Sequence, residues 1–534
     1  MRRTACLVAL LFAVLAPAAP AADAPARPAT SAEPAFDVLE FEVHGNTVLP
    51  VLAIEQAVSP HLGQQRGMAA VEAARAALDK AYQQAGFLSV VVDIPEQRVD
   101  QGVVVLRVVE GSVAQLRVTG ARHFSQGWIR DKVPALAPGS VPDFNAVQTQ
   151  LAALNRSAER RVQPLLSAGA VPGTLNAELR VEDSLPLAAS LTLHNRHAAN
   201  TVPWRLAASL RYDNLFQREH SLSLTAITAP EAPRQTRVLV LNYAVPTDDG
   251  GRWTVQLVDS DSLTEPLGSS VIGQGSTLGV KRSWPLPGAG DFSHGLTLGL
   301  DLKRVQQRIV AGSDVLASPL RYLPLSAAWS GVLAGADHST QFDLTLTLAN
   351  RAVLRRTVRC AGQAEDQFAC AQRDADGSFM TLRADLRHDR ALGAGGWRLA
   401  GRLALQQATG ALVSGEQFAL GGADTVRGHL ESATAGDQAW LASLTLRTPN
   451  QAPRLGLATN AELVFSAFAD AGGTTLLAPA IGQAGHRQLA GAGLGMAVRL
   501  GGQLDGNLDL AWPLHRSGNS LGDPRLHAQL QWKF

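Results

Sequence analysis

The sequence predicts two small α+β units followed by a closed antiparallel barrel of 16 membrane-spanning strands. Apolar residues recur at helical spacing only before residue 185. From residue 187 onward, short segments alternate polar and apolar side chains, and many have roughly the 9 to 11 residues that a tilted strand needs to cross a membrane. The number of these segments is even, as a single-chain bacterial barrel requires.

The first residues have the pattern of a secretory signal peptide. Arg2 and Arg3 precede an apolar run from Ala5 to Ala16, and small residues follow. We therefore expect residues 1–22 to be cleaved and residues 23–35, rich in alanine and proline, to form a flexible lead. A signal anchor is the alternative, but the apolar run is shorter than the roughly 20 residues of a spanning helix.

Residues 36–184 predict two copies of one α+β pattern. In residues 36–111 the order is strand, helix, helix, strand, strand, and residues 112–184 repeat it. The landmarks match between the copies, because VHGNTVLP pairs with VTGARHFS and VVEG pairs with RVED. An internal duplication of about 75 residues per unit is the simplest interpretation. Two unrelated small domains are the alternative.

The barrel is expected over residues 185–534. In its last strand, RLHAQLQWKF, Leu526 and Trp532 share one face while Gln529 and Gln531 share the other. A half-buried strand of a soluble sheet would alternate in the same way. However, the remaining sequence cannot supply a covering layer for 16 strands, whereas lipid can, and in lipid the sheet must close to pair every backbone group. The expected strands are 187–196, 203–214, 218–229, 235–245, 252–261, 275–284, 293–305, 320–333, 338–350, 378–389, 396–408, 438–448, 460–471, 488–499, 502–513 and 525–534.

The connections between these strands predict the topology. If the first strand rises from the periplasm, the connections at 306–319, 351–377, 409–437 and 472–487 are extracellular, and all four are long. Turns on the other side, such as 246–251, are short. Long outer loops and short periplasmic turns are typical of outer-membrane barrels.

Two cysteines remain after the signal peptide, and both lie in the connection 351–377. Cys360 and Cys370 are ten residues apart, which in an exported chain predicts a disulfide. Closing so short a loop would contribute roughly 2 to 3 kcal/mol. A metal site is not expected, because neither a histidine nor a further cysteine lies nearby.

Charge and motifs argue against several function classes. The chain has 47 Lys and Arg against 46 Asp and Glu, so a strongly charged partner such as nucleic acid is not expected. Neither G-x-x-x-x-G-K-[ST] nor H-E-x-x-H occurs, and the glycine-rich stretch 491–497 lacks the strand–helix context of a dinucleotide site. We interpret that stretch as a strand with small outward residues. The protein is therefore expected to be neither an enzyme nor a cofactor- or metal-binding protein.

The connection 409–437 contains a charged, glycine-rich motif that a loop tip in water would not need. Gly421, Gly422 and Gly428 permit unusual backbone conformations. If the loop folds back into the barrel, Arg427 needs an acceptor. Phe468, Asp470 and Gly472 share one face of a later strand, and Asp470 is the expected acceptor.

Here the sequence resembles a known family, the TpsB transporters of two-partner secretion (the ShlB/FhaC/HecB haemolysin secretion/activation family, in the BamA-related superfamily). YQQAGF and VVEG in residues 36–111 resemble POTRA domains, and LNRSAERRVQPLLSAGAVPGT resembles the second POTRA domain of these transporters. The remaining matches are with the family's VRGY loop motif (Val426, Arg427, Gly428, His429) and its F-x-D-x-G strand motif (Phe468, Asp470, Gly472).

The resemblance implies an outer-membrane protein with periplasmic POTRA domains and no catalytic activity. It implies export of an unfolded TpsA-type exoprotein, haemagglutinin- or haemolysin-like, through the lumen, with activation of such a cargo as a further implication. It implies contact with outer-membrane lipid and with the barrel assembly machinery during biogenesis. In the family the loop arginine pairs with the strand aspartate, and we hypothesise that this pair holds the loop in a transport-competent position. We expect a wet ion pair, worth ~0 to 1 kcal/mol.

The sequence departs from the family pattern twice. His429 replaces the usual tyrosine, and residues 23–35 are too short and proline-rich for the family's N-terminal plug helix. A BamA-like assembly insertase is the alternative function, although such proteins usually carry three or more POTRA domains. A passive porin has no use for residues 36–184.

Cargo recognition is expected at open strand edges of the POTRA domains, because an edge can add a strand from an extended partner. The candidate edges are 88–94 and 161–165, and Pro164 is compatible with an edge because it lacks an N–H. The candidate partner-binding residues are Leu88, Val90, Val92, Ile94, Arg161 and Leu165.

Overall fold

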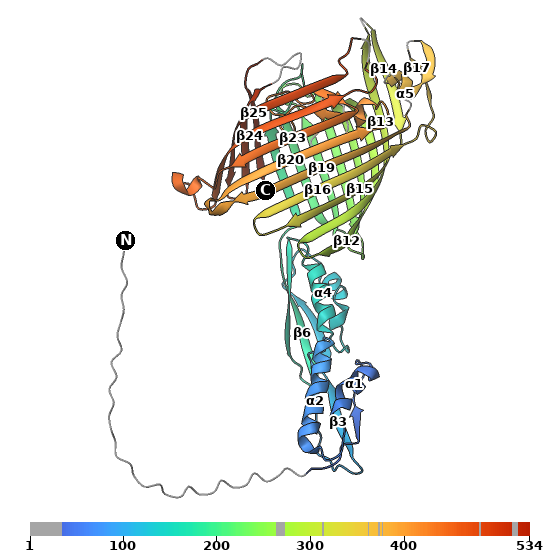
Figure 1. Ribbon diagram of the computed structural model, residues 1–534, viewed down its shortest axis with the longest axis vertical. Helices are drawn as coiled ribbons and strands as arrows, with labels where there is room; N and C mark the ends of the chain where they lie inside the picture. The colour runs from blue at the N-terminus through green and yellow to red at the C-terminus, as the bar shows by residue number, and fades with distance from the viewer. Residues whose placement is uncertain are drawn as a thin grey trace, which may run out of the picture. The chain divides into compact units, whose positions relative to one another are not determined.

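The computed structural model describes residues 35–262, 273–311, 314–360, 362–371, 374–375, 377–479, 482–514 and 522–534 (Figure 1). These residues form two compact units. The first contains residues up to Gly120 together with Ile129–Glu182, and the second contains Ala121–Trp128 and Asp183–Phe534. The expected signal peptide and nearly all of the lead lie outside the described residues. No helix in the described part of the chain is long and apolar enough to cross a membrane.

The first unit begins with a three-stranded sheet in the order β1-β3-β2. Its strands are β1 (Glu40–His44), β2 (Val90–Asp93) and β3 (Val103–Glu110). β1 pairs parallel with β3, and β2 pairs antiparallel with it. The helices α1 (Val51–Val58), η1 (Ser59–His61) and α2 (Gly67–Gln84) lie between β1 and β2 in the chain.

The core of this sheet follows from two periodicities. In α2, Val71, Ala74, Leu78 and Tyr82 are buried at helical spacing and face the sheet. In β3 every second residue is buried, as a sheet covered on one face requires. The helix ends before Gly86, whose φ of 99° a side chain would resist.

The second half of the unit repeats this plan, as the sequence predicts. Its sheet has the order β4-β6-β5, with β4 (Ser112–Thr119), β5 (Arg160–Ala168) and β6 (Thr174–Asp183). The chain between β4 and β5 contains α3 (Gln126–Asp131), η2 (Pro134–Leu136) and α4 (Phe144–Leu154).

Gly86 also connects the two halves of this unit. Its carbonyl accepts a hydrogen bond from the Phe144 N–H at 2.9 Å. A Cβ at Gly86 would lie 2.5 Å from Oδ1 of Asp143, which caps α4 by accepting from Asn145 and Ala146. A glycine is therefore needed where the start of α4 approaches the end of α2.

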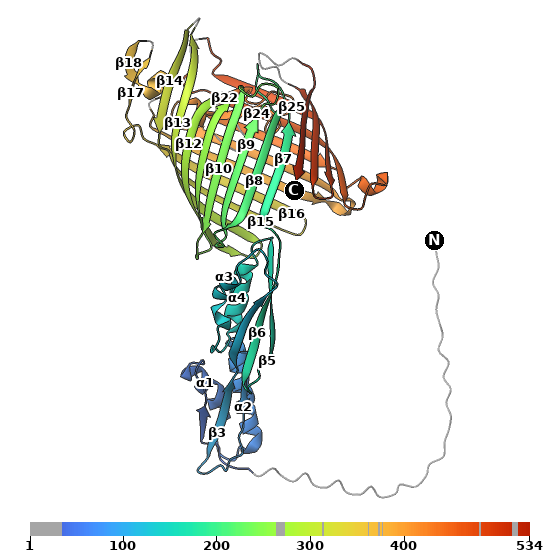
Figure 2. The same cartoon turned by 180° about the vertical axis from the view of Figure 1, so that it is seen from behind.

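The second unit is a closed antiparallel barrel (Figure 2). Seventeen strand segments form it, but β14 and β15 pair with successive parts of β13, so they are one interrupted strand and the barrel has 17 − 1 = 16 strands. The segments are β7 (Leu187–His194), β8 (Arg205–Leu215), β9 (His220–Thr228), β10 (Thr236–Pro246), β11 (Arg252–Ser262), β12 (Gly273–Ala289), β13 (Phe292–Ala311), β14 (Asp314–Tyr322), β15 (Leu325–Ala334), β16 (His338–Ala349), β19 (Phe379–Leu392), β20 (Trp397–Ala408), β23 (Gln438–Arg447), β24 (Ala461–Thr475), β25 (His486–Leu500), β26 (Leu504–Pro513) and β27 (Arg525–Lys533).

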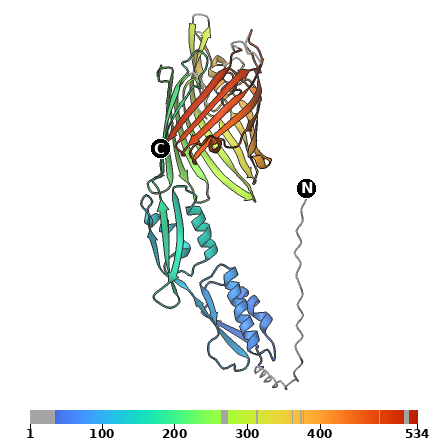
Figure 3. The ribbon, with the colours of Figure 1, turned by 90° about the vertical axis from the view of Figure 1, so that its left-hand side faces the viewer.

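The last strand closes the barrel against the first. β27 pairs antiparallel with β7 from Gln529 opposite His194 to Lys533 opposite Ser190. The Phe534 N–H extends this pairing by donating to the Ala189 carbonyl at 2.9 Å. Figure 3 shows the tilted strands of this side of the barrel in red. The predicted alternation is present, since Leu526, Leu530 and Trp532 of β27 are exposed on the outer face.

The prediction of a long loop at 306–319 is wrong. β13 continues to Ala311 and β14 begins at Asp314, so a paired hairpin replaces the loop. β13 has 20 residues, about twice the length that a tilted strand needs to cross a membrane, so the alternation that identifies spanning strands is not required along all of it. The connection 472–487 is also shorter than expected, because β24 ends at Thr475 and β25 begins at His486.

The other two long connections contain structure of their own. Residues 351–377 include β17 (Thr357–Cys360), β18 (Gln363–Asp366) and α5 (Gln367–Ala371). Residues 409–437 include η4 (Ser414–Glu416), β21 (Phe418–Leu420) and β22 (Thr434–Gly436). The short helices η3 (Gly393–Gly395) and η5 (Ala452–Leu455) lie in periplasmic turns.

Candidate functional site

The connection 409–437 packs against the inner wall of the barrel, and we call it the in-folded loop. Its strands β21 and β22 pair with each other, from Phe418 opposite Gly436 to Leu420 opposite Thr434. The loop residues Phe418, Leu420 and Val426 are buried together with wall residues of β20, β23 and β25. The chain therefore returns into the lumen.

Arg427 and Asp470 form a bidentate ion pair between the in-folded loop and β24. Arg427 Nε lies 2.7 Å from Asp470 Oδ2, and Nη2 lies 2.9 Å from Oδ1. The side chains are 12% and 0% exposed, so the expectation of a wet pair is wrong. The loop covers the carboxylate, and sequence alone does not reveal that cover.

Other groups complete the coordination of both charges. The Asp470 carboxylate also accepts the Arg427 backbone N–H at 3.1 Å and the Ser443 hydroxyl at 2.6 Å. The Arg427 guanidinium lies 3.4 Å from the ring centroid of Phe468 and donates to the Thr445 hydroxyl at 3.2 Å. A second carboxylate, Asp509, lies 3.7 Å from Nη1. Every polar edge of the guanidinium thus faces a partner on the wall.

All three residues of the F-x-D-x-G segment contact the loop. Phe468 lies against the guanidinium and Asp470 pairs with it. Gly472 leaves room for Leu420, because a Cβ at Gly472 would lie 2.8 Å from Leu420 Cδ1. The three residues therefore lie on the face of β24 that contacts the loop.

The remaining loop-motif residues are buried against the wall. Val426 is fully buried. Gly428 has a φ of 91°, which favours glycine, and its N–H donates to His527 Nε2 at 3.1 Å. His429 is 1% exposed, with Nε2 3.1 Å from the Ala490 carbonyl oxygen. His429 is therefore packed against β25 and does not lie at a water-exposed loop tip.

The glycine-rich stretch 491–497 forms part of the seat for the loop, which the sequence analysis missed. We expected its small residues to face outward, but Leu494 is the exposed outer residue and Gly491 faces the loop. A Cβ at Gly491 would lie 1.9 Å from the Arg427 carbonyl oxygen. The signal was available, because Gly491, Gly493 and Gly495 alternate along one face of the strand.

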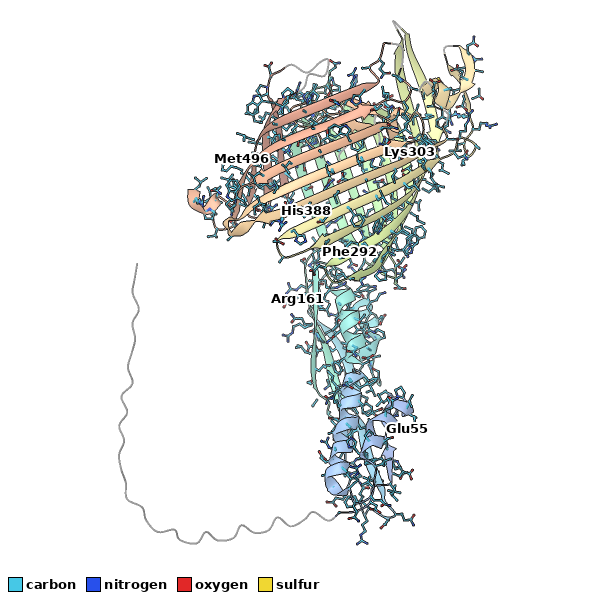
Figure 4. All side chains as sticks on the ribbon, in the orientation of Figure 1. Glu55, Arg161, Phe292, Lys303, His388 and Met496 are labelled. Atoms are coloured by element: carbon cyan, nitrogen blue, oxygen red, sulfur yellow. The ribbon has the colours of Figure 1, made fainter. Side chains whose placement is uncertain are left out.

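A second ion pair holds the start of the loop. Lys303 Nζ lies 2.6 Å from Glu416 Oε1, and the two side chains are 7% and 9% exposed. The Tyr322 hydroxyl donates to the same oxygen at 2.7 Å. Lys303 belongs to β13 (labelled in Figure 4) and Tyr322 to β14, so this contact lies on a different part of the wall from Asp470. Sequence reasoning did not identify these residues, which are separated by up to 113 positions.

An apolar cluster continues from this second ion pair toward the extracellular segment 351–377. Leu412 and Val413 of the loop pack with Tyr322 and with Phe368 of α5. Cys370, also in α5, is disulfide-bonded. Its predicted pairing with Cys360 stays a prediction, since the Cys360 side chain lies outside the described part of the structure.

A cavity of about 840 Å³ lies between the in-folded loop and the wall. Loop residues Asp424 and Thr425 line one side, and Arg387, Arg402 and Arg447 line another. Arg402 also donates to the Asp424 carbonyl at 2.8 Å. The lumen is therefore polar, as an interior that faces water requires.

The predicted POTRA edges are at the borders of their sheets. β2 and β5 each pair with one neighbour, and Leu88, Arg161 (labelled in Figure 4) and Leu165 are exposed. Val90 and Val92 are instead buried, so only their backbone could contact a partner. The Val92 carbonyl accepts a long hydrogen bond of 3.4 Å from Arg75. Their role in binding stays a prediction.

The chain is similar to several known proteins. The outer membrane transporter CdiB of Dickeya dadantii (strain 3937) is 24% identical over 432 residues, which cover 76% of this chain and 71% of that protein. The structure of CdiB from Escherichia coli matches with a TM-score of 0.61 at 18% identity, covering 96% of this chain and 93% of that one. BamA from Haemophilus ducreyi lacking POTRA domains 1–3 matches with a TM-score of 0.56 at 14% identity, covering 93% and 100%.

Two family models match the chain. The ShlB-type POTRA domain model matches residues 36–111. The model described as haemolysin secretion/activation protein ShlB/FhaC/HecB matches residues 173–498, which is more than half of the chain. The POTRA domain, the 16-stranded barrel and these matches establish that the chain belongs to the ShlB/FhaC/HecB family, the TpsB-type protein transporters of the outer membrane with periplasmic POTRA domains.

Proposed function

We propose that this transporter exports one large TpsA-type exoprotein, haemagglutinin- or haemolysin-like, from the periplasm through the barrel lumen to the cell surface. The in-folded loop supports this proposal most directly. Its contacts with the wall are ion pairs, hydrogen bonds and apolar packing, which can break and form again without chemistry.

Recognition of the cargo is proposed at the edges of β2 and β5. Each edge has backbone groups that could pair with an extended segment of an unfolded chain. Leu88 and Leu165 are exposed apolar side chains beside these edges and could contact alternate side chains of the incoming strand. An incoming strand at β2 would replace the long Arg75–Val92 hydrogen bond, which is a weak competitor at 3.4 Å.

Passage is proposed to follow release of the loop from the wall. The Arg427–Asp470 pair would hold the loop in the position from which transport starts. Folding of the cargo at the cell surface would supply the driving free energy, and activation of a haemolysin- or adhesin-type cargo would accompany export. The lipid around the barrel, and the barrel assembly machinery during insertion, are proposed as further partners.

The BamA-like insertase is the rival function and has less support. The insertase shares the barrel and the loop motif, but such proteins usually carry three or more POTRA domains. The described chain has two α+β domains before the barrel. The family model that matches the barrel is that of a haemolysin secretion protein.

Deletion of the gene in its host distinguishes the two functions. We expect one large exoprotein to disappear from the culture medium while other barrel proteins remain in the outer membrane, as measured by quantitative proteomics of both fractions. A broad loss of barrel proteins from the outer membrane would instead establish the insertase.

Site-specific photocrosslinking tests the proposed recognition edges. A photoreactive amino acid at Leu88 or at Leu165 should crosslink to the exoprotein that the deletion identifies. Glu40, exposed on the opposite edge strand β1, is the matched control and should not crosslink. Crosslinking at Glu40 alone would contradict this assignment and indicate that the exoprotein binds at β1.

A further inference from the structure

The periplasmic connection between β23 and β24, residues 448–460, folds over the outer surface of the barrel, and we call it the periplasmic foot. It contains η5 (Ala452–Leu455) and is visible in orange beside the lower end of β24 in Figure 1. Other periplasmic turns, such as that between β15 and β16, span only a few residues. The extra length of the foot therefore forms a structure of its own.

Hydrogen bonds fix the path of the foot. The Gln451 N–H donates to the Leu463 carbonyl at 2.8 Å, so the chain stays against β24. The Asn450 side chain accepts from the Ala452 and Leu463 N–H groups, at 2.9 Å each, and donates to the Ala461 carbonyl. Gly456, with a φ of 69°, ends the helical turn. The foot thus has a defined orientation rather than that of a free loop.

The foot packs on the face of the sheet that points away from the lumen. Ala452 is fully buried against Leu463, Met496 and Val498. Side chains alternate along β24, and Asp470 faces the lumen, so the odd-numbered position of Leu463 faces outward. Met496 lies opposite the outward residue Phe465 and is labelled on this side of the barrel in Figure 4.

Two leucines of the foot are exposed. Leu455 is 62% exposed and Leu457 is 45% exposed. Arg454 is also exposed, and its Nη1 donates to the Gln451 side chain at 3.1 Å. An apolar pair beside a cation at the edge of a lipid-facing surface matches the chemistry of a phospholipid leaflet, which is apolar below and anionic at its surface.

The foot lies next to strands that have few outward aromatic residues at their periplasmic ends. Elsewhere, tryptophans face outward near the periplasmic strand ends, namely Trp253, Trp329, Trp397 and Trp532. From β23 to β26, the described outward residues of the periplasmic halves include one aromatic side chain, Phe465. Aromatic residues fix a barrel at the membrane interface, so another anchor is expected on this side.

We propose that the periplasmic foot is an interfacial anchor that inserts Leu455 and Leu457 into the phospholipid leaflet facing the periplasm, with Arg454 at the level of the lipid phosphates. The foot is continuous with the lipid-facing surface through Ala452 and Leu463. This continuity favours lipid over a periplasmic protein as the occupant. The anchor braces β24 and β25, the strands that carry Asp470 and Gly491.

Fluorescence quenching in defined vesicles tests the anchor. A cysteine at Leu455 is labelled with an environment-sensitive fluorophore, and the full-length protein is reconstituted into phosphatidylethanolamine–phosphatidylglycerol vesicles that contain nitroxide-labelled lipid. Leu494→Cys, on the outer face of β25, is the lipid-exposed reference. Asp248→Cys, exposed in the periplasmic turn between β10 and β11, is the water-exposed reference. Heat-modifiable migration on gels verifies that each variant is folded.

We expect the label at Leu455 to be quenched by the nitroxide lipid several-fold more than the label at Asp248, and most strongly when the nitroxide lies near the headgroup. Quenching equal to that at Asp248 would overturn the proposal. A label that is shielded only after addition of periplasmic extract would also overturn it, because the occupant would then be a protein. If Leu455→Cys does not fold, the same quenching measurement is made on Leu457→Cys, and its result decides whether the foot inserts into the leaflet.

Discussion

Replacing Arg427 with alanine is expected to release the in-folded loop while the barrel stays folded. The substitution removes two charge-assisted hydrogen bonds to Asp470, of 2.7 and 2.9 Å, and the contact with the Phe468 ring. It leaves the Asp470 carboxylate, which is 0% exposed, with the Ser443 hydroxyl and the loop backbone as partners. The barrel strands keep their backbone pairing, so the substitution reduces the free energy of loop docking and not that of barrel folding.

The size of the effect follows from the burial of the pair. Removing one partner of a buried ion pair costs about 3 to 5 kcal/mol. Since 1.4 kcal/mol is a factor of ten, the docking equilibrium should shift toward the released loop by roughly a hundred- to a few thousand-fold. An exposed pair would give a shift of less than about tenfold. The structure thus predicts a much larger effect than the sequence alone does.

Planar-bilayer conductance and secretion of the exoprotein measure this release. Arg427→Ala should raise the idle conductance and reduce secretion, with normal heat-modifiable migration of the barrel. Arg427→Lys should be intermediate, because lysine keeps the charge but lacks the planar fork. Asp509→Asn should have a small effect, since its carboxylate is 3.7 Å from the guanidinium. A folded Arg427→Ala variant with wild-type conductance and secretion would refute the reasoning.

Three further predictions concern other parts of the loop seat. Glu416→Gln and Lys303→Met should each raise conductance, and their double variant should show a coupling of about 0.5 to 3 kcal/mol in loop docking; strict additivity would contradict the second ion pair. Gly491→Ala should also raise conductance by displacing the loop backbone, whereas Gly401→Ala, with no atom nearer than 4.0 Å to the new methyl group, should not; equal effects would exclude a steric cause. Burial lowers the pKa of His197, whose carbonyl accepts a hydrogen bond from the loop, so the folded state disfavours protonation and loses stability as the pH falls below about 6.5. Conductance should rise on acidification in the wild type and less in His197→Gln, and identical pH profiles would count against this role.

The barrel could be predicted from sequence because lipid imposes a local rule. A strand with lipid on one face and water on the other must alternate its side chains, and each strand shows this separately. The prediction failed at residues 306–319, because β13 is about twice as long as a membrane-spanning strand needs to be and the rule does not apply to its excess length. The repeated α+β pattern before residue 185 was also local, since each helix shows its own apolar spacing.

The candidate site could be predicted only in part. Arg427 and Asp470 were found because each needs a partner of opposite charge and both resemble family motifs. Lys303, Glu416 and Gly491 were not found, because their sequence neighbours do not indicate which residues they meet. Glycine in a strand, in particular, has no side chain whose chemistry would suggest a role.

The sequence by itself thus determined the class of fold and the topology of the barrel, since both follow from local periodicity. It also determined the identity of the loop cation, since Arg427 needs an acceptor and lies in a segment that resembles the family's loop motif. Only the tertiary structure decided that the Arg427–Asp470 pair is buried, that Gly491 leaves room for the loop backbone and that residues 448–460 turn outward onto the barrel. Burial and steric fit depend on segments that are far apart in the chain. They exist only once the barrel has closed and the loop has returned into it.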